Sequence, residues 1–371
     1  MNRGDAPADI AAVVAKNAGK AVAGPLSGPH PEPPARGASV LPGHWEPMPF
    51  FGVILVLLLG AGGWAIIYFA NSAVLLSLVV PAMTYAIFAL AVGFLVKQNG
   101  WVSFGHAAFY GLPAYATAIA FTTGAVAPGL AVIGSVLATA ALAFLLALVI
   151  GRTSGVALGM LTLAIGQAFY ELATKVRAFG GSDGLTVTNP EALFGLPGDV
   201  FLDRSSMFLI SWAALLAVMI GLELLVRSPF GKLTEAIRDN AERARFIGYR
   251  PLVHQASVFA ISAFVAAVAG ILAMLNSGFV SPDLLDWNSS GTALIMALLG
   301  GITRVWGPVL GAIAYVVLRD YLGDATEHWP AIVGASLIIV VVAFPTGLSG
   351  LLLRAMTRLA GLRGRAARGG R

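Results

Sequence analysis

The sequence predicts an all-α integral membrane protein: a polytopic bundle of about ten transmembrane or partly spanning helices, with one polar cytoplasmic helix. Of its 371 residues, 58% are hydrophobic and only 11% are charged, and the mean hydropathy is +0.84. Soluble domains carry roughly 25% charged residues, so this composition indicates a chain whose solvent is lipid. The chain has no cysteine, so neither a disulfide framework nor thiol chemistry is expected.

Composition divides the chain into three parts. Residues 1–48 are rich in Ala, Gly and Pro and hold no continuous apolar run, which favours a disordered cytoplasmic tail. Residues 49–353 form the transmembrane domain. Residues 354–371 carry six arginines and no acid, and are expected to be a basic cytoplasmic tail.

Apolar runs of about 20 residues, the length that crosses the hydrocarbon core, locate the spans. The apolar run at 290–301 is too short for a complete crossing, and GITRVWGP separates it from the next span. Ser103, Gly105 and His106 lie in a Gly-rich stretch at membrane depth, where irregular backbone is tolerated only if protein buries it or it lines a cavity. The spans are expected near 51–70, 73–96, 106–123, 128–150, 155–172, 206–226, 256–276, 307–322 and 329–353.

A charged island at residues 227–250 stands between two apolar spans. Ser228-Pro229 ends the preceding span, because proline cannot continue a helix. A single helix is predicted over 232–246, with Gly248 as its stop signal.

Two features of this predicted helix bear on its role. Asp239 with Arg243, and Arg238 with Glu242, are opposite charges at i,i+4 spacing. A modest apolar stripe favours docking into a groove on a partner protein, and the alternative is a solvated loop. The stripe consists of Leu233, Ala236, Ile237, Ala241 and Ala244.

The distribution of positive charge predicts the orientation. With ten crossings and the island inside, all but four of the 23 Lys and Arg residues fall on the cytoplasmic side, as the positive-inside rule requires. Both termini and the island are therefore expected in the cytoplasm. The formal charge of +5 is explained by this topology, and no nucleic-acid partner is expected. The four outer residues are Lys175, Arg177, Arg204 and Arg319.

Four stretches in order, within roughly residues 50–352, resemble the LivM-type permease subunits of branched-chain amino-acid ABC importers. These are WVSFGHAAFYGLPAYATA at 101–118, MLTLAIGQAFYEL followed by GGSDGLT, SPFGKLTEAIRDNAERARFIGY at 228–249, and SGTALIMALLGGITRVWGPVLGA at 290–312. The third resembles the coupling loop of that family.

The resemblance implies the permease subunit of an ATP-driven importer in the bacterial inner membrane. Its implied partners are a second related permease subunit, two cytoplasmic ATPase subunits, a periplasmic substrate-binding protein and membrane lipid. This chain has no phosphate-binding GxxxxGK[ST] loop, so it is not expected to be an enzyme or to hold a cofactor; ATP and Mg would be bound by the partners. The resemblance assigns ATPase coupling to the helix of the island, and the candidate residues are Gly231, Glu235, Ala236, Ile237, Arg238, Asp239, Asn240 and Gly248.

Five residues are candidates for the translocation pathway, each with a structural alternative. His106 is the one histidine well inside an apolar stretch, and it either lines the pathway or bonds to backbone freed by nearby glycines. Ser103 and Gln167 could meet a zwitterionic substrate, or could simply bond neighbouring helices. Gly300 and Gly301 mark either a broken-helix binding site or tight packing.

Two other classes of function would leave different signals in the sequence. An ion-coupled secondary transporter would need intramembrane carboxylates or an ion site at unwound helices, and no acid is evident in the middle of a span. A membrane enzyme would need clustered acids, metal-spaced histidines or a nucleophile with its base, and no catalytic or metal motif is present. The substrate stays open among branched-chain amino acids, other amino acids, urea-like amides and organic acids.

Overall fold

A computed structural model describes residues 73–188, 190–325, 328, 330–332, 334–335, 338 and 347–352, and gives the backbone alone for 73–75 and 324–325. Eight of the ten predicted membrane segments lie within these residues, and each forms a helix. The predicted tails and the span at 51–70 lie outside them, as does most of 329–353. The eight helices are α3 (Ala73–Asn99), α4 (Ala107–Thr123), α5 (Pro128–Ile150), α6 (Val156–Lys175), α7 (Arg204–Arg227), α10 (Pro251–Ser277), α11 (Trp287–Gly300) and α12 (Gly307–Ala325).

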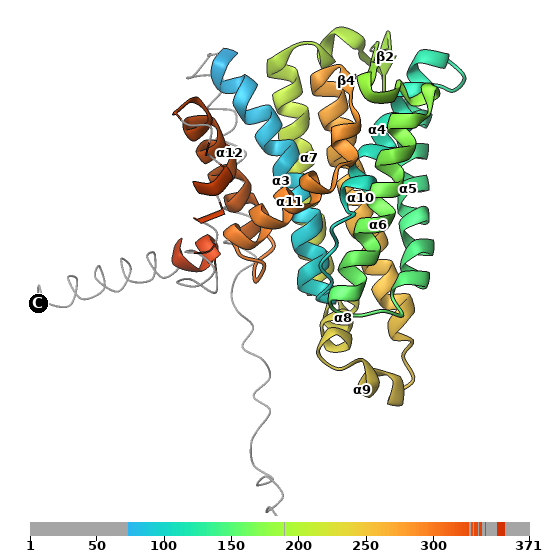
Figure 1. Cartoon of the computed structure of the whole chain (residues 1–371), viewed down its shortest axis with the longest axis vertical. Coiled ribbons are helices and arrows are strands. Elements are labelled where there is room, and N and C mark those ends of the chain that lie inside the picture. Colours follow the sequence, from blue (N-terminus) through green and yellow to red (C-terminus); the bar gives the residue numbers. More distant parts are fainter. Residues whose placement is uncertain are drawn as a thin grey trace, which may run out of the picture. The chain divides into compact units, whose positions relative to one another are not determined.

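Five of the described helices, α3, α5, α6, α7 and α10, are long and apolar enough to cross a membrane. Helices α3 and α10 are the inner ones: 72% of the most apolar window of each is buried, against 22–33% for the other three. α10 packs against α3, α4 and α5, and α3 also contacts α7, α11 and α12 (Figure 1).

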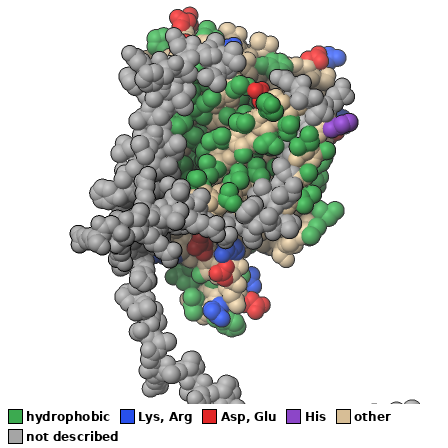
Figure 2. All heavy atoms as spheres, turned by 90° about the vertical axis from the view of Figure 1, so that its left-hand side faces the viewer, with side chains coloured by type: hydrophobic (Ala, Val, Ile, Leu, Met, Phe, Trp, Pro, Cys, Tyr) green, Lys and Arg blue, Asp and Glu red, His purple; other side chains and the backbone are tan. Residues whose placement is uncertain are grey.

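The outer helices expose apolar side chains at helical spacing. On α5, Leu130, Ile133 and Leu137 face outward, and Leu145 and Val149 continue the same row. On the face drawn in Figure 2, apolar side chains cover the body of the bundle and charged ones gather below, where α8 and α9 lie. Such a surface would be an aggregation hazard in water, and it suits a helix that borders lipid.

Two helices start inside the bundle because the chain before each is irregular. After α3, residues 100–106 form no helix, yet Trp101, Ser103, Gly105 and His106 are buried. After α10, β4 (Phe279–Val280) and the 3₁₀ turn η4 (Pro282–Leu285) lead into α11. The prediction of irregular backbone buried within protein is confirmed for 101–106.

The irregular segments after α3 and after α10 resemble each other, and the two helices that precede them run in opposite directions. Gly100 and Gly278 end their helices with positive φ, 68° and 64°. Each donates its N–H to the carbonyl four residues back at 2.9 Å. The sequences that follow are similar, GWVS at 100–103 and GFVS at 278–281. Because α3 runs toward α8 and α10 runs away from it, the two units have inverted topology, an arrangement common in transporters.

Helices α4 and α11 meet at their first turns. The Ala107 N–H at the start of α4 donates to Ser290 Oγ in α11 at 2.7 Å, and both residues are buried. Gly111 allows the close approach of η4, since a Cβ there would lie 2.6 Å from Leu285 Cδ2. The start of α11 is therefore fixed against the start of α4.

The end of the bundle opposite α8 is covered by the 176–203 connection. Its strand β1 (Leu185–Thr186) pairs antiparallel with β4, with Leu185 opposite Val280. Strands β2 (Ala192–Leu193) and β3 (Leu196–Pro197) form a hairpin. The 3₁₀ turns η1 (Arg177–Phe179), η2 (Gly181–Asp183) and η3 (Gly198–Phe201) complete this segment.

Candidate functional site

The charged island folds as two helices, which corrects the single helix predicted over 232–246. α8 spans Pro229–Asp239 and α9 spans Ala241–Phe246. Asn240 separates them with extended angles, φ −156° and ψ 94°. Its Oδ1 accepts the Arg243 N–H at 2.8 Å, so Asn240 acts as the N-cap of a new helix instead of continuing the old one.

Both ends of the island are built by local signals. Ser228 caps α8 by accepting the Gly231 N–H at 3.3 Å, with Pro229 in the first turn. Gly248 follows α9 with φ 93°, consistent with the predicted stop. Among the residues that the structure describes, neither predicted i,i+4 ion pair forms, because each would have to cross the break between α8 and α9. Arg238 instead pairs with its neighbour Asp239 at 2.9 Å.

Part of the apolar stripe of the island faces the protein's own bundle, whereas Leu233 and Ala241 are half-buried and Ala236 is exposed. The Ile237 side chain is 1% exposed, and Ala244 is also buried. Gly231 sits so close to the end of α7 that a Cβ would lie 2.4 Å from the carbonyl oxygens of Leu225 and Val226. Ile237, Ala244 and the close approach of Gly231 therefore anchor α8 and α9 to the membrane helices.

A polar clamp joins α8 to the last turn of α3. Gln98 Nε2 donates to a carboxylate oxygen of Glu235 at 3.5 Å, which leaves Gln98 Oε1 to accept the Thr234 hydroxyl in a short hydrogen bond. Arg238 Nη1 donates to the Lys97 carbonyl, one of the last-turn carbonyls that lack a helical partner. Three residues of α8 thus hold the end of α3.

The clamp reaches further helices through α3. Lys97 Nζ lies 4.0 Å from the Glu235 carboxylate and donates to the Thr303 carbonyl, in the turn before α12, at 3.1 Å. Asn99 Nδ2 donates to the Gln255 carbonyl near the start of α10 at 2.9 Å. A displacement of α8 would therefore pull on α3, α10 and the turn between α11 and α12 together.

The exposed apolar surface of the island lies at the end of α9 and just after it. Phe246, Ile247 and Tyr249 are 90%, 70% and 44% exposed, so three large apolar or aromatic side chains project from a polar end of the molecule. Among the coupling candidates, Ala236, Arg238, Asp239, Asn240 and Gly248 are exposed, Glu235 is half-buried, and Gly231 and Ile237 are buried. Sequence reasoning missed Phe246 and Ile247, although two adjacent large apolar residues after a basic helix were a visible signal.

The interior candidates are dispersed. His106 and Ser103 lie on the irregular segment before α4, Gln167 lies on α6, and Gly300 and Gly301 end α11. Within the described part of the chain, Ser103 Oγ and Gln167 Oε1 are buried without a hydrogen-bond partner, so these atoms do not bond to each other.

His106 is fully buried and fixed by its neighbours. Its Nε2 lies 2.9 Å from Ser262 Oγ, which also donates to the Ala91 carbonyl at 2.7 Å. Because the serine has one proton and the carbonyl only accepts, His106 Nε2 must donate to Ser262. The rings of Phe88, Phe109 and Phe259 surround the imidazole. His106 thereby joins α3, α4 and α10, with a serine side chain in place of the freed backbone that was expected.

Gly300 and Gly301 allow close helix packing. A Cβ on Gly300 would lie 1.9 Å from the Gly307 carbonyl oxygen, and one on Gly311 would lie 1.8 Å from the Met296 carbonyl oxygen. A Cβ on Gly347 would approach Gly301 Cα at 2.5 Å. This geometry supports tight packing of α11 against α12 for the glycine pair.

Metal chemistry has no candidate among the residues that the structure describes, because no three His, Asp or Glu side chains there are grouped to hold an ion. The organised features are instead the clamped polar loop at one end and the two helix starts inside the bundle. Such an arrangement suits a membrane protein that changes conformation.

Comparison with known proteins identifies the family that the chain matches. The family described as "Branched-chain amino acid transport system / permease component" matches residues 74–342. The high-affinity branched-chain amino acid transport system permease protein LivM of Salmonella typhimurium strain LT2 is 26% identical over 323 residues, 80% of this chain and 74% of that protein. The LivM protein of Escherichia coli K12 is 29% identical over 294 residues, 72% of this chain and 68% of that protein.

A second kind of permease is also similar. The LivH protein of Escherichia coli K12 is 29% identical over 151 residues, 39% of this chain and 48% of that protein. No solved structure matches the chain. Since the family match spans most of the chain and includes both broken helices and the clamped loop, the chain belongs to the family of branched-chain amino acid transport system permease components.

Proposed function

We propose that this permease works in an ATP-driven ABC importer of the bacterial inner membrane. In this proposal it pairs with a second related permease subunit, and the pair forms the path for branched-chain or related small amino acids. A periplasmic binding protein delivers the solute, and two cytoplasmic ATPase subunits bind ATP and Mg. The LivM and LivH relatives, two different permease proteins of branched-chain amino acid transport, support the paired arrangement.

The observation that carries the proposal is the build of the charged island. Its buried side fastens it to the membrane helices through Ile237 and the Thr234–Gln98–Glu235 clamp. Its exposed side presents Phe246 and Ile247, which suit insertion into an apolar groove. A loop that is fastened to the membrane helices on one side and exposes an apolar surface on the other can transmit a movement of the ATPase to α3 and α10.

In this mechanism the ATPase subunits bias the permease between two states. ATP binding would bring the two ATPases together and move the α8–α9 pair that each holds; α3 would follow because Arg238 holds its last turn. A ligand shifts such an equilibrium only by as much as its affinities for the two states differ. The clamp couples this equilibrium to the membrane helices, since it makes the position of α3 depend on the position of α8.

The test is recovery of partners from native membranes. We expect purification of this subunit to bring down two ATPase subunits and a second permease, identified by mass spectrometry. Ile247→Asp should lower recovery of the ATPases while the second permease remains. Leu202→Asp is the matched control, because Leu202 is also 70% exposed but lies near the opposite end of the bundle. Recovery of an active protein without partners would favour a secondary transporter instead.

A further inference from the structure

An aromatic side chain in an unfavourable backbone conformation projects from the end of the bundle opposite α8. Strands β2 and β3 pair Leu193 with Leu196, so Phe194 and Gly195 form the two-residue turn of a hairpin. Both turn residues have positive φ, 53° and 82°, as a type I′ turn requires. Asn-Gly fits such a turn, whereas a bulky residue at positive φ is strained. Strain of this kind points to a function for the phenylalanine ring.

The Phe194 ring lies against the first turn of α5. A Cβ on Gly129 would lie 3.2 Å from Phe194 Cε1, and β2 contacts α5 (Figure 1). The Phe194 side chain nevertheless remains 60% exposed, and Leu196, the next apolar residue of the tip, is 44% exposed. Leu193 is only 1% exposed, so it holds the hairpin on the bundle while the tip projects.

The tip continues the lipid-facing side of α5. Leu130, directly after Gly129, is 63% exposed and begins the outward row of apolar side chains on that helix. α5 has 23 residues, which is about 34 Å at 1.5 Å per residue and slightly more than the hydrocarbon core of about 30 Å. Its first turn therefore lies where the hydrocarbon meets the headgroups, the level at which aromatic side chains gather in membrane proteins.

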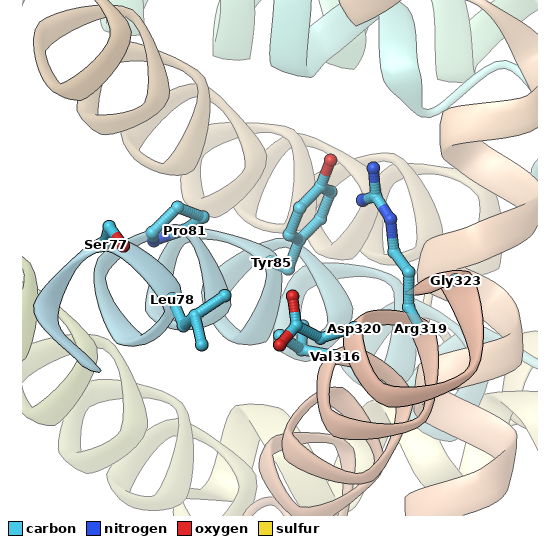
Figure 3. Close-up of a pocket in the computed structure, with 8 residues that line it drawn as sticks. All are labelled: Ser77, Leu78, Pro81, Tyr85, Val316, Arg319, Asp320 and Gly323. Atoms are coloured by element: carbon cyan, nitrogen blue, oxygen red, sulfur yellow. The ribbon is translucent and has the colours of Figure 1, made fainter. Parts of the chain in front are cut away.

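Charged residues are absent from the tip and from the helix beside it. No Lys, Arg, Asp or Glu stands between Glu191 and Asp199, and none occurs in residues 98–151, which include α5. The hollow of about 270 Å³ between α3 and α12 differs in this respect, since the exposed Arg319 and Asp320 are among its lining residues (Figure 3). That hollow suits contact with water, whereas the hairpin tip suits contact with hydrocarbon.

We propose that residues 194–196 form a membrane-interface anchor, in which the Phe194 ring and the Leu196 side chain enter the bilayer leaflet opposite α8, beside the start of α5. The occupant is lipid, because the exposed surface is continuous with the lipid-bordering row of α5 and offers no charge to a polar partner. Insertion is shallow, on the order of 5–10 Å, since the backbone N–H and C=O groups of the turn must stay within reach of water or headgroups. The inference needs only a membrane-spanning α5, so it does not depend on the importer function proposed above.

The connection that carries this anchor also holds the break before α11. Its strand β1 pairs with β4, and the Val187 N–H donates to the Gly278 carbonyl at 2.8 Å. The Gly198 N–H closes the base of the hairpin by donating to the Glu191 carbonyl at 2.8 Å. The anchor therefore fixes to lipid the same segment whose strand β1 is paired with the α10–α11 break.

The experiment uses the absence of cysteine from this chain, which lets one introduced cysteine carry a nitrobenzoxadiazole fluorophore. The complex co-purified from native membranes is reconstituted into phosphatidylcholine vesicles with iodide on both sides, and the complex without the added cysteine gives the background. The fluorophore at Leu196→Cys should be quenched by lipid that is spin-labelled near the top of its acyl chain, and protected from iodide. Glu191→Cys, at the base of the same hairpin, is the matched probe and should be quenched by iodide and little by the lipid label.

A second substitution separates the ring from the turn. Asn tolerates positive φ, so Phe194→Asn should keep the hairpin and the unfolding temperature of the complex while removing the ring. In the Leu196→Cys background it should cause loss of most of the lipid quenching and a gain of iodide quenching. Phe194→Tyr keeps an aromatic ring suited to the interface and should leave both signals as they are with Phe194.

Three results would overturn the anchor. Iodide quenching at Leu196→Cys as strong as at Glu191→Cys would show that the tip lies in water. Shielding of Leu196→Cys from both quenchers would show that a protein partner covers the tip in place of lipid. Equal lipid quenching with Phe194 and with Phe194→Asn, at the same unfolding temperature, would show that the ring does not hold the tip in the bilayer.

Discussion

Replacing Thr234 with valine should weaken the link between α8 and α3. Thr234 and Gln98 are 2% and 0% exposed, and the valine side chain has nearly the same shape without the hydroxyl. Gln98 Oε1 would lose its donor in a site that water does not reach, which costs about 1–3 kcal/mol. Because the Thr234 hydroxyl is also placed to donate to the Gly231 carbonyl at 2.9 Å, we expect the lower part of that range, about 1–2 kcal/mol.

A double-mutant cycle isolates this contact. Gln98→Ala alone removes the bonds to both Thr234 and Glu235, and the double variant should cost little more than Gln98→Ala. The interaction energy between the two sites should then be about 1 kcal/mol. Thr153→Val is the control, since the Thr153 hydroxyl donates only to the Ile150 carbonyl within its own turn.

The assay measures thermal unfolding of the purified complex and the number of ATP molecules hydrolysed per amino acid transported. Thr234→Val should lower the unfolding temperature and raise the ATP cost of transport, because the ATPases would move α8 with less effect on α3. If stability falls while the ratio of ATP to solute stays at the wild-type value, the clamp holds the fold but does not transmit force. Unchanged stability and unchanged ratio would refute the hydrogen-bond assignment itself.

Three other predictions concern packing, pH and topology. Gly270→Ala should abolish the yield of folded protein in membranes, because the added Cβ would lie 1.8 Å from the Tyr110 carbonyl oxygen. Gly221→Ala is the control and should be tolerated, because its Cβ would meet nothing within 4 Å. Equal yields of the two variants would contradict this packing. Asp203 caps α7 through the Ser206 N–H at 2.9 Å and hydroxyl at 2.7 Å, which lowers its pKa. The stabilisation by ionised Asp203 is therefore present above the unfolded pKa of about 3.9 and is lost as pH falls through the lower folded pKa. Asp203→Asn should flatten the fall in melting temperature at acid pH. An unchanged fall would exclude this carboxylate as its cause. Because the chain has no cysteine, single cysteines at Ser182 and Arg245 should react with an impermeant thiol reagent from opposite sides of intact vesicles, and labelling from the same side would contradict the topology.

The membrane helices could be predicted from sequence because lipid imposes a simple rule. Runs of about 20 apolar residues gave the described spans with bounds close to those of α5, α7 and α10. The irregular start of α4 was also predictable, since Ser, Gly and His at membrane depth do not suit a lipid-facing helix. The similarity of GWVS and GFVS became meaningful only when both were seen to follow a buried helix of opposite direction.

The island was predicted less well because local charge patterns competed. The i,i+4 charges favoured one continuous helix, while Asn240 is a good N-cap residue, and the cap prevailed. The burial of Ile237 depends on α8 folding back against α3, a long-range contact that helical periodicity on α8 does not contain.

The interior sites depended on tertiary packing. Gly300 and Gly301 could mark either a binding site or close packing until Gly307, Gly311 and Gly347 were placed against them.

The most direct test of the importer is leucine uptake into vesicles that contain this chain with its co-purified partners. Uptake should require ATP on the side of the ATPase subunits and loaded binding protein on the other, and should persist when ion gradients are collapsed. Uptake by this chain alone, driven by an ion gradient and indifferent to ATP, would contradict the account.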